Sequence, residues 1–388
     1  MRLTFLYILK LPSTLFKSQN AWEQRKLGEI AEEVKGNSGS INNIPILTIS
    51  AANGWMNQKD RFSQIIAGNE LKKYTLLKKG ELSYNHGNSK LAKYGTVFVQ
   101  DSHDQALVPR VYHSFKMVAQ NNPYFMEYLF ASGLPKKELS KIVTSGARMD
   151  GLLNINKKEF FSIKLNSPSS EEQSRIAKLF QSLDKTITLH EEQHRQLERL
   201  KKALLQKMFA DKTGYPALRF KGFTEKWEQS YLKDIASVNS GRDYKHLNKG
   251  NIPVYGTGGY MLSVDKALSN TKDGIGIGRK GTINNPYILK APFWTVDTLF
   301  YVIPYNVDLN FLYGIFQKID WRKKDESTGV PSLSKENINK TKFKIPAISE
   351  QREIGTIFQN LDTLITLHQH KIDNLKRLKR ALLQKMFV

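Results

Sequence analysis

The sequence contains no cysteine, which excludes disulfide bridges and thiolate metal sites from the chemistry of this chain. It also lacks any apolar run approaching the roughly 20 residues of a membrane-spanning helix. A short apolar stretch at Phe5–Leu9 is interrupted by Lys10, and no small-residue cleavage site follows it, so it is a poor signal peptide. These absences predict a cytoplasmic chain without membrane contact, with an irregular N-terminus over residues 1–21.

Motifs of catalysis are also scarce. The chain has no G-x-x-x-x-G-K-[ST] phosphate loop. The glycine run Gly274–Gly278 and the tetrapeptides at Asn121–Tyr124 and Asn284–Tyr287 resemble parts of an adenine methyltransferase. However, the second tetrapeptide residue is Asn instead of Pro, and the glycine run is too close to Asn284 for loops on separate strands. His190 and His368 lie in apolar stripes without ligand spacing. We therefore predict no catalytic residue, no metal site and no cofactor in this chain.

Negative charge is in short supply. The chain has 59 Lys and Arg against 36 Asp and Glu, which gives a formal net charge of +23. Such an excess favours a polyanionic partner, and nucleic acid is the first candidate. A membrane surface, an acidic protein partner and an ordinary solvated surface are the other interpretations of the same charge.

What the sequence does have is an internal repeat. Glu171–Ala210 aligns without a gap to Ser349–Val388, more than half of the aligned pairs are identical, and both copies contain ALLQKMF. Fainter matches extend the repeat: WEQRKLGEIA begins at Trp22 and WEQSYLKDIA at Trp227, and an INK triplet precedes each repeated tail. The chain thus contains two related halves. They share the opening segment, the INK triplet and the tail, and they differ in the sequence between these segments.

Each repeated tail has the pattern of a long helix. Its apolar residues recur at alternating steps of four and three, which is heptad spacing, and Ser precedes Glu in the first turn. The two stripes either pack together as a coiled coil or cover each tail's own domain. A pseudo-dyad would make the coil antiparallel, although the sequence also allows a parallel pair. The stripe residues include Phe180, Leu183, Ile187, Leu197 and Leu204 in the first copy, and Phe358, Leu361, Ile365, Leu375 and Leu382 in the second.

The pattern predicts an α+β protein with two related α/β domains separated by two long helices. Its segments are an N-terminus at 1–21, a domain at 22–170, a helix at 171–210, a linker at 211–226, a domain at 227–348 and a helix at 349–388. Short strands rich in β-branched residues alternate with turns rich in Gly, Asn and Lys in both domains.

The loops of these domains carry side chains suited to duplex DNA. Lys and Arg hold phosphates or pair with guanine, and Asn pairs with adenine in the major groove. We expect reading loops at Ser50–Asp60, Tyr84–Gly95, Tyr255–Met261 and Gly274–Tyr287, the first and third in matching places after an Ile-Pro strand. The candidate DNA-binding residues are Asn53, Asn57, Asn88, Ser89, Lys90, Lys93, Tyr94, Arg148, Tyr255, Tyr260, Arg279 and Lys280.

The repeated tails, the WEQRKLGEIA openings and the two divergent domains together resemble the specificity subunit of type I restriction-modification systems. The resemblance covers Trp22–Val388. It implies two target-recognition domains, each reading one half of a split site in double-stranded DNA, separated by an antiparallel pair of helices. It also implies that two modification subunits dock on the helices, which the stripe residues would support, and that restriction subunits join them. S-adenosylmethionine, ATP and Mg²⁺ would then be bound by those partner subunits.

Two other functions fit parts of the sequence. A stand-alone DNA-binding regulator or architectural protein would bridge two sites through its own coiled coil and need no methyltransferase. An autonomous DNA methyltransferase would bind S-adenosylmethionine itself. Assembly with modification subunits distinguishes the first from a specificity subunit, and cofactor binding by the purified chain tests the second.

Overall fold

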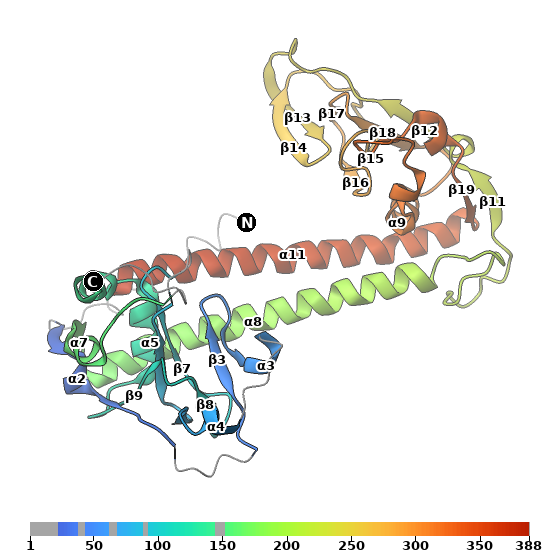
Figure 1. The fold of residues 1–388 in the computed structure, drawn as a ribbon. Helices are drawn as coiled ribbons and strands as arrows, with labels where there is room; N and C mark the ends of the chain where they lie inside the picture. Colours follow the sequence, from blue (N-terminus) through green and yellow to red (C-terminus); the bar gives the residue numbers. More distant parts are fainter. Residues whose placement is uncertain (1–21, 38–42, 62–67, 88–91, 144–151, 388) are drawn as a thin grey trace. The chain divides into compact units, whose positions relative to one another are not determined.

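The computed structural model describes residues 22–37, 43–61, 68–87, 92–143 and 152–387 (Figure 1). Its contacts divide the chain into two compact units, one of Met1–Leu189 with Asp373–Val388 and the other of His190–Ile372. The two long helices α8 (Ser170–Lys207) and α11 (Ile348–Met386) each contribute one part to each unit. The mixed fold with two long helices that the repeat predicted is confirmed.

The long helices have 38 and 39 residues, and their first turns carry glutamates while their last turns carry lysine. These charges oppose the partial charges of the helix dipole at each end. Proline is absent from both, and the one glycine, Gly355 in α11, has a packing reason. A Cβ there would lie 2.4 Å from Oδ1 of Asp308 and 3.0 Å from the backbone N of Phe311. Glycine therefore lets the start of a neighbouring helix approach α11 closely.

The first unit is built around a four-stranded antiparallel sheet in the order β2-β9-β6-β7, with the hairpin β3-β4 and the pair β5-β8 beside it. Helix α5 packs on β7 and shares one apolar core with the sheet and with the long helices. The bounds are β1 (Glu23–Lys26), α2 (Leu27–Ile30), β2 (Ala31–Glu33), β3 (Leu47–Ser50), β4 (Gly54–Asn57), α3 (Gln58–Arg61), α4 (Gly68–Leu71), β5 (Thr75–Lys78), β6 (Leu82–Asn85), β7 (Thr96–Val99), β8 (Gln105–Val108), β9 (His113–Met117), α5 (Pro123–Ser132), α6 (Lys136–Ile142), α7 (Lys157–Ser162) and β10 (Lys164–Ser167).

The second unit repeats this plan with a four-stranded sheet in the order β12-β18-β15-β16 and a three-stranded sheet β14-β13-β17. Helix α9 takes the place of α5 against α11 (Figure 1). The bounds are β11 (Glu228–Tyr231), η2 (Leu232–Asp234), β12 (Ala236–Ser240), β13 (Lys249–Gly256), β14 (Gly259–Val264), β15 (Gly274–Gly278), β16 (Tyr287–Leu289), β17 (Trp294–Thr295), β18 (Leu299–Pro304), α9 (Leu309–Lys318), η3 (Trp321–Lys324), α10 (Lys335–Asn339) and β19 (Lys342–Ile345).

The repeated openings form equivalent strands. In the first unit β1 pairs antiparallel with β10, and in the second β11 pairs antiparallel with β19. In each case the partner strand directly precedes a long helix. The two WEQ segments therefore each pair with the strand that leads into a long helix. The two long helices α8 and α11 together form the helix frame of the protein.

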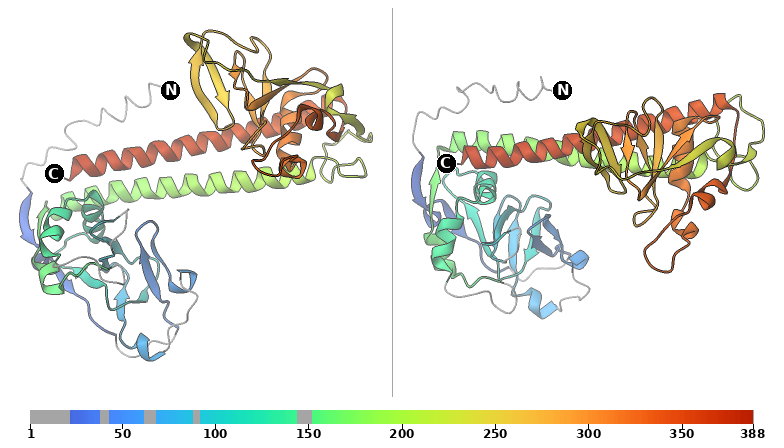
Figure 2. Two further views of the ribbon diagram at one scale, coloured as in Figure 1. Left: turned by 45° about the horizontal axis from the view of Figure 1, so that its top comes forward. Right: turned by 90° about the horizontal axis from the view of Figure 1, so that it is seen from above.

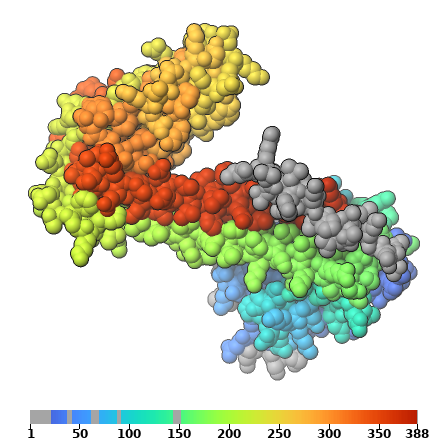
Figure 3. Space-filling view, turned by 180° about the vertical axis from the view of Figure 1, so that it is seen from behind, coloured from blue at the N-terminus to red at the C-terminus, as the bar shows by residue number. Residues whose placement is uncertain are grey.

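The long helices pair antiparallel within each unit. In the first, Asp184 of α8 forms an ion pair with Lys379 of α11, and Phe180 contacts Phe387 just after α11. In the second unit, residues further along the chain from the start of α8 contact residues nearer the start of α11. The contacting pairs are His190–His368, Lys201–Asp362 and Phe209–Phe358. The α8 and α11 segments of a unit lie side by side in both views of Figure 2 and touch in Figure 3. The orientation that the sequence left open is thus antiparallel.

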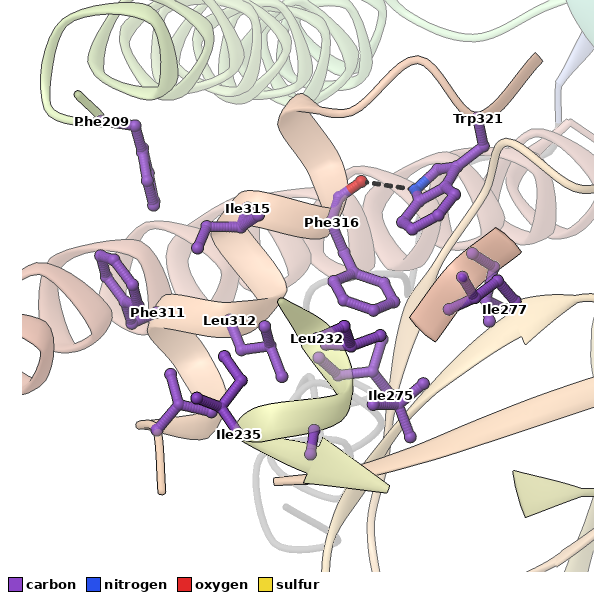
Figure 4. Packing of buried hydrophobic residues seen from close by; sticks show 14 of the residues in the cluster. Phe209, Leu232, Ile235, Ile275, Ile277, Phe311, Leu312, Ile315, Phe316 and Trp321 are labelled. Carbon is purple, nitrogen blue, oxygen red and sulfur yellow. Dashed lines mark hydrogen bonds between the residues drawn. The ribbon is translucent and has the colours of Figure 1, made fainter. Parts of the chain in front are cut away.

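Each unit has its own apolar core, and each core includes both long helices. In the first unit Ile176, Phe180 and Phe387 pack with residues of α5 and of the central sheet. In the second, Phe209 and Phe358 join a core that Figure 4 shows in part, where the indole Nε1 of Trp321 donates a hydrogen bond of 2.9 Å to the Phe316 carbonyl. Each long helix therefore starts on its own half's domain and ends on the other half's domain.

Two buried titratable groups lie in the first unit. Burial raises the pKa of Glu127 on α5 to about 7, although its carboxylate accepts a 2.7 Å hydrogen bond from the backbone N–H of Val99. Burial, together with the neighbouring His86, lowers the pKa of His113 on β9 to about 4. Both groups are thus held nearer to their neutral forms than in water.

Candidate nucleic-acid interface

The repeated ALLQKMF segment ends in a phenylalanine that fills an aromatic cage. In the first unit Phe387 packs against Trp22, Phe125 and Phe180, with ring centroids 6.0, 5.5 and 5.9 Å away. Phe387 is only 2% exposed. Its cage thus combines the start of the first domain, helix α5 and the start of α8.

The second unit repeats this cage around Phe209. The ring centroids of Trp227, Phe311 and Phe358 lie 6.4, 5.3 and 5.5 Å from it. Phe209 ends the first half of the chain but packs in the second unit, and Phe387 ends the second half but packs in the first. The identical tails are therefore exchanged between the halves, and the phenylalanine that ends each tail fits one of two equivalent cages.

A buried glutamine near the start of each long helix makes the same link in both units. The side-chain Oε1 of Gln173 accepts a 2.9 Å hydrogen bond from the N–H of Asn122, and that of Gln351 accepts one of 2.9 Å from Asp308. Asn122 and Asp308 are the N-caps of α5 and α9. The two glutamines thus fix a domain helix to the helix frame in each unit.

The predicted stripe residues all lie inside this frame. Each is buried or half-buried, namely Phe180, Leu183, Ile187, Leu197, Leu204, Phe358, Leu361, Ile365, Leu375 and Leu382. Their role in partner docking stays a prediction. Periodicity alone missed the exposed leucines on the helices, of which Leu189 and Leu367 occupy equivalent positions of the repeat and are 55% and 50% exposed.

The candidate DNA-binding residues of the first unit are only partly described. Asn53 is exposed in the turn between β3 and β4, and Asn57 is exposed at the end of β4. Lys93 is exposed with its ammonium 5.5 Å from the half-buried Tyr94 ring. Arg61 donates a hydrogen bond of 2.6 Å to the Ile49 carbonyl, which anchors the hairpin. Asn88, Ser89, Lys90 and Arg148 lie outside the described residues.

The candidates of the second unit lie on a hairpin and at a strand end. Tyr255 and Tyr260 are opposite each other on β13 and β14, with centroids 6.4 Å apart, and Tyr260 is 63% exposed. Arg279 and Lys280 are exposed directly after β15. The segment Val296–Thr298 joins these places, because Val296 N–H donates to the Tyr255 carbonyl while the Arg279 N–H donates to Thr298.

One predicted reading loop needs correction. Gly274–Gly278 is the buried strand β15, which pairs with both β16 and β18. A Cβ at Gly278 would lie 2.1 Å from the Thr282 carbonyl oxygen, so its glycine permits close backbone packing. Only the segment after the strand is a loop. Similarly, Tyr84 in the other predicted loop is buried in β6 and is not available for contact with DNA.

The apparent methyltransferase tetrapeptides have structural roles. Asn122 caps α5 by accepting hydrogen bonds from the N–H groups of Tyr124 and Phe125, at 3.0 and 3.1 Å. Asn284 accepts one of 2.7 Å from the Trp321 N–H. The described residues contain no group of three His, Asp or Glu side chains placed to hold a metal ion. No helix in the described part of the chain could cross a membrane.

Comparison with known proteins gives consistent matches. The family described as Type I restriction modification DNA specificity domain matches residues 19–199 and 224–377. The specificity subunit of the type I restriction enzyme MjaVIII from Methanocaldococcus jannaschii is 23% identical over 298 residues, 66% of this chain and 68% of that protein. The crystal structure of a type I restriction-modification S subunit from M. genitalium has a TM-score of 0.70 at 16% identity, covering 96% of this chain and 98% of that one.

Proposed function

This chain belongs to the type I restriction modification DNA specificity family, and from that premise we propose that it is the DNA-reading subunit of a type I restriction-modification complex. The observation that carries the proposal is the double match of the family over both halves of one chain. The halves share the aromatic cages and the helix frame but differ in their loops. A repeated frame suits repeated partners, and divergent loops suit two different DNA sequences.

The substrate is a split, asymmetric site in double-stranded DNA, with one half-site read by each domain. The net charge of +23 supplies the attraction to phosphates, and the exposed loop side chains supply base contacts. The chain directs adenine methylation and restriction without catalysing either. S-adenosylmethionine, ATP and Mg²⁺ belong to the partner subunits.

The partners are two modification subunits, which dock at equivalent places on the helix frame, and the restriction subunits that join them in the cytoplasm. The exposed leucines Leu189 and Leu367 are repeat equivalents and thus suit two copies of one partner. This assembly distinguishes the proposal from a stand-alone DNA-binding regulator, which the family membership disfavours.

Single-molecule sequencing of genomic DNA for methyladenine, with and without this gene, tests the proposal. The expected result is the loss of one split, asymmetric methylated motif when the gene is removed, and its return when the gene is restored. An unchanged methylome in cells whose modification subunits are active would refute it.

A further inference from the structure

The second unit contains a cleft of about 800 Å³ between the end of β15 and the segment that connects η3 to α10. Arg279, Lys280 and Lys335 contribute positive charge to its lining, and Glu326 contributes one carboxylate. No salt bridge joins Arg279 or Lys280 to a carboxylate within the described ranges. The Arg279 guanidinium uses one donor, its Nη1, in a long hydrogen bond of 3.5 Å to the Asp297 carbonyl. The cleft therefore presents positive charge that no carboxylate neutralises by an ion pair, with further guanidinium and ammonium donors facing solvent.

The segment that connects η3 to α10 is a loop held by hydrogen bonds to one side chain. The Asp325 side-chain Oδ1 accepts hydrogen bonds from the Ser327 N–H, the Ser327 hydroxyl and the Ser332 N–H, at 3.0, 2.8 and 2.9 Å. These bonds fold the loop so that Thr328–Val330 form its tip, and Val330 is 55% exposed. One carboxylate thus closes the loop and holds its tip beside the cleft.

Arg279 is held in place from both sides. Its backbone N–H donates to Thr298 at 2.8 Å, and its carbonyl accepts from Leu333 at 2.9 Å. Its guanidinium carbon lies 5.8 Å from the centre of the Phe300 ring, close enough for a cation–π contact. Lys280 forms a β-bridge with Ser332, which joins the strand end to the loop. The Arg279 backbone and its guanidinium are therefore positioned before any ligand binds.

The first unit has the corresponding bridge between Gly87, after β6, and Leu152. Strand β6 lies in the centre of its sheet as β15 does in the second unit. In both units the end of a central strand is thus bridged to a residue much later in the chain. The side chains at this bridge differ between the halves.

We propose that this cleft is the base-reading site of the second domain, in which Arg279 contacts a guanine edge and Lys280 contacts a phosphate. The inference rests on the proposed function. A guanidinium offers parallel N–H donors that match O6 and N7 of guanine, and a prepositioned side chain loses less entropy on binding. Lys280 is an exposed, flexible ammonium, which suits phosphate contact. The Asp325 loop, with its tip at Thr328–Val330, forms the other wall of the site.

The test uses the complete complex and the methylated motif of the wild-type chain. Arg279→Lys keeps the charge but removes the planar fork. It should lower the preference for guanine over other bases at one position of one half-site by a factor of about 5 to 150. The preferences at the other half-site should not change. Lys280→Gln should weaken binding to all sequences alike. Lys290→Gln is the matched control, because Lys290 pairs with Asp273 at the opposite end of β15.

A second measurement changes the DNA, and its main result comes from the wild-type complex. Wild-type complex is titrated with duplexes that carry 7-deazaguanine at each guanine of the half-sites in turn, which removes the N7 acceptor. In the wild-type complex, the replacement should weaken binding at one guanine position only. In Arg279→Ala the same replacement should cost nothing further, because alanine has no donor for N7. Uniform responses at all guanines, or equal losses for wild type and variant, would overturn the reading role of Arg279. A wild-type complex without any split motif would instead overturn the proposed function.

Discussion

Each repeated tail packs in the unit that holds the other half's domain. This exchange of tails predicts which domain a substitution in each tail destabilises. Replacement of Phe387 by Ala empties the aromatic cage of the first unit, although Phe387 belongs by sequence to the second half. Replacement of Phe209 by Ala empties the cage of the second unit. Each variant should therefore destabilise the domain of the opposite half.

The magnitude follows from burial. Phe387 and Phe209 are 2% and 4% exposed, and each touches three aromatic rings. Removal of a buried phenylalanine ring costs about 3–5 kcal/mol. Since about 1.4 kcal/mol is a factor of ten, amides protected by the affected core should exchange at least about a hundredfold faster.

Hydrogen exchange read by mass spectrometry resolves the two domains. Phe387→Ala should speed exchange in α5 and leave α9 near its wild-type rate, and Phe209→Ala should do the reverse. Leu189→Ala is the control, because this leucine is 55% exposed and its loss should change neither helix. Faster exchange of α9 in Phe387→Ala, with α5 unchanged, would refute the exchange of tails.

Three other perturbations follow from the contacts. Glu127 has a pKa of about 7, above its ordinary 4.5, so its contribution to stability is greatest below pH 4.5 and is lost as pH rises through 7. Glu127→Gln should therefore gain stability relative to wild type over that range, as measured by urea denaturation, and a constant difference would contradict this. Arg219 makes two 2.8 Å bonds to Glu350, whose side chain is 1% exposed, so Arg219→Ala should destabilise the second unit by about 3–5 kcal/mol. Arg219→Ala with Glu350→Gln should recover much of this loss, and no recovery would mean that packing dominates. A heptad inserted at one position of both α8 and α11 should alter the gap between the methylated half-sites but not their sequences. Altered half-site sequences would contradict the spacer role of the helices.

The sequence predicted the helices well because their pattern is local. Heptad spacing over Ile176–Leu204 and its copy needs no tertiary information, and α8 and α11 follow it closely. The destination of Phe209 was beyond such reasoning, because the same apolar residue fits a cage in either half. Only the folded structure shows which cage each phenylalanine occupies.

The reading loops were harder to predict for another physical reason. Alternating glycines at Gly274–Gly278 are typical of a turn, yet here they allow close backbone packing in a central strand. The Asp325 loop depends partly on a hydrogen bond from Ser332, seven residues away, which the sequence does not display. A signal was present in the Asp-x-Ser spacing, which favours a local side-chain turn.

The meeting of His190 with His368, ring nitrogens 3.1 Å apart, has a meaning beyond local packing. These residues are counterparts in the repeat, and contact between counterparts is expected where a segment pairs antiparallel with its own copy. The ion pairs obey the same rule, because Asp184–Lys379 and Lys201–Asp362 are one contact made twice. Such a pattern is expected if an ancestral gene encoded a half-length homodimer and then duplicated in tandem. Fusion would have freed each copy's loops to evolve separately while preserving the inherited contacts between the two long helices.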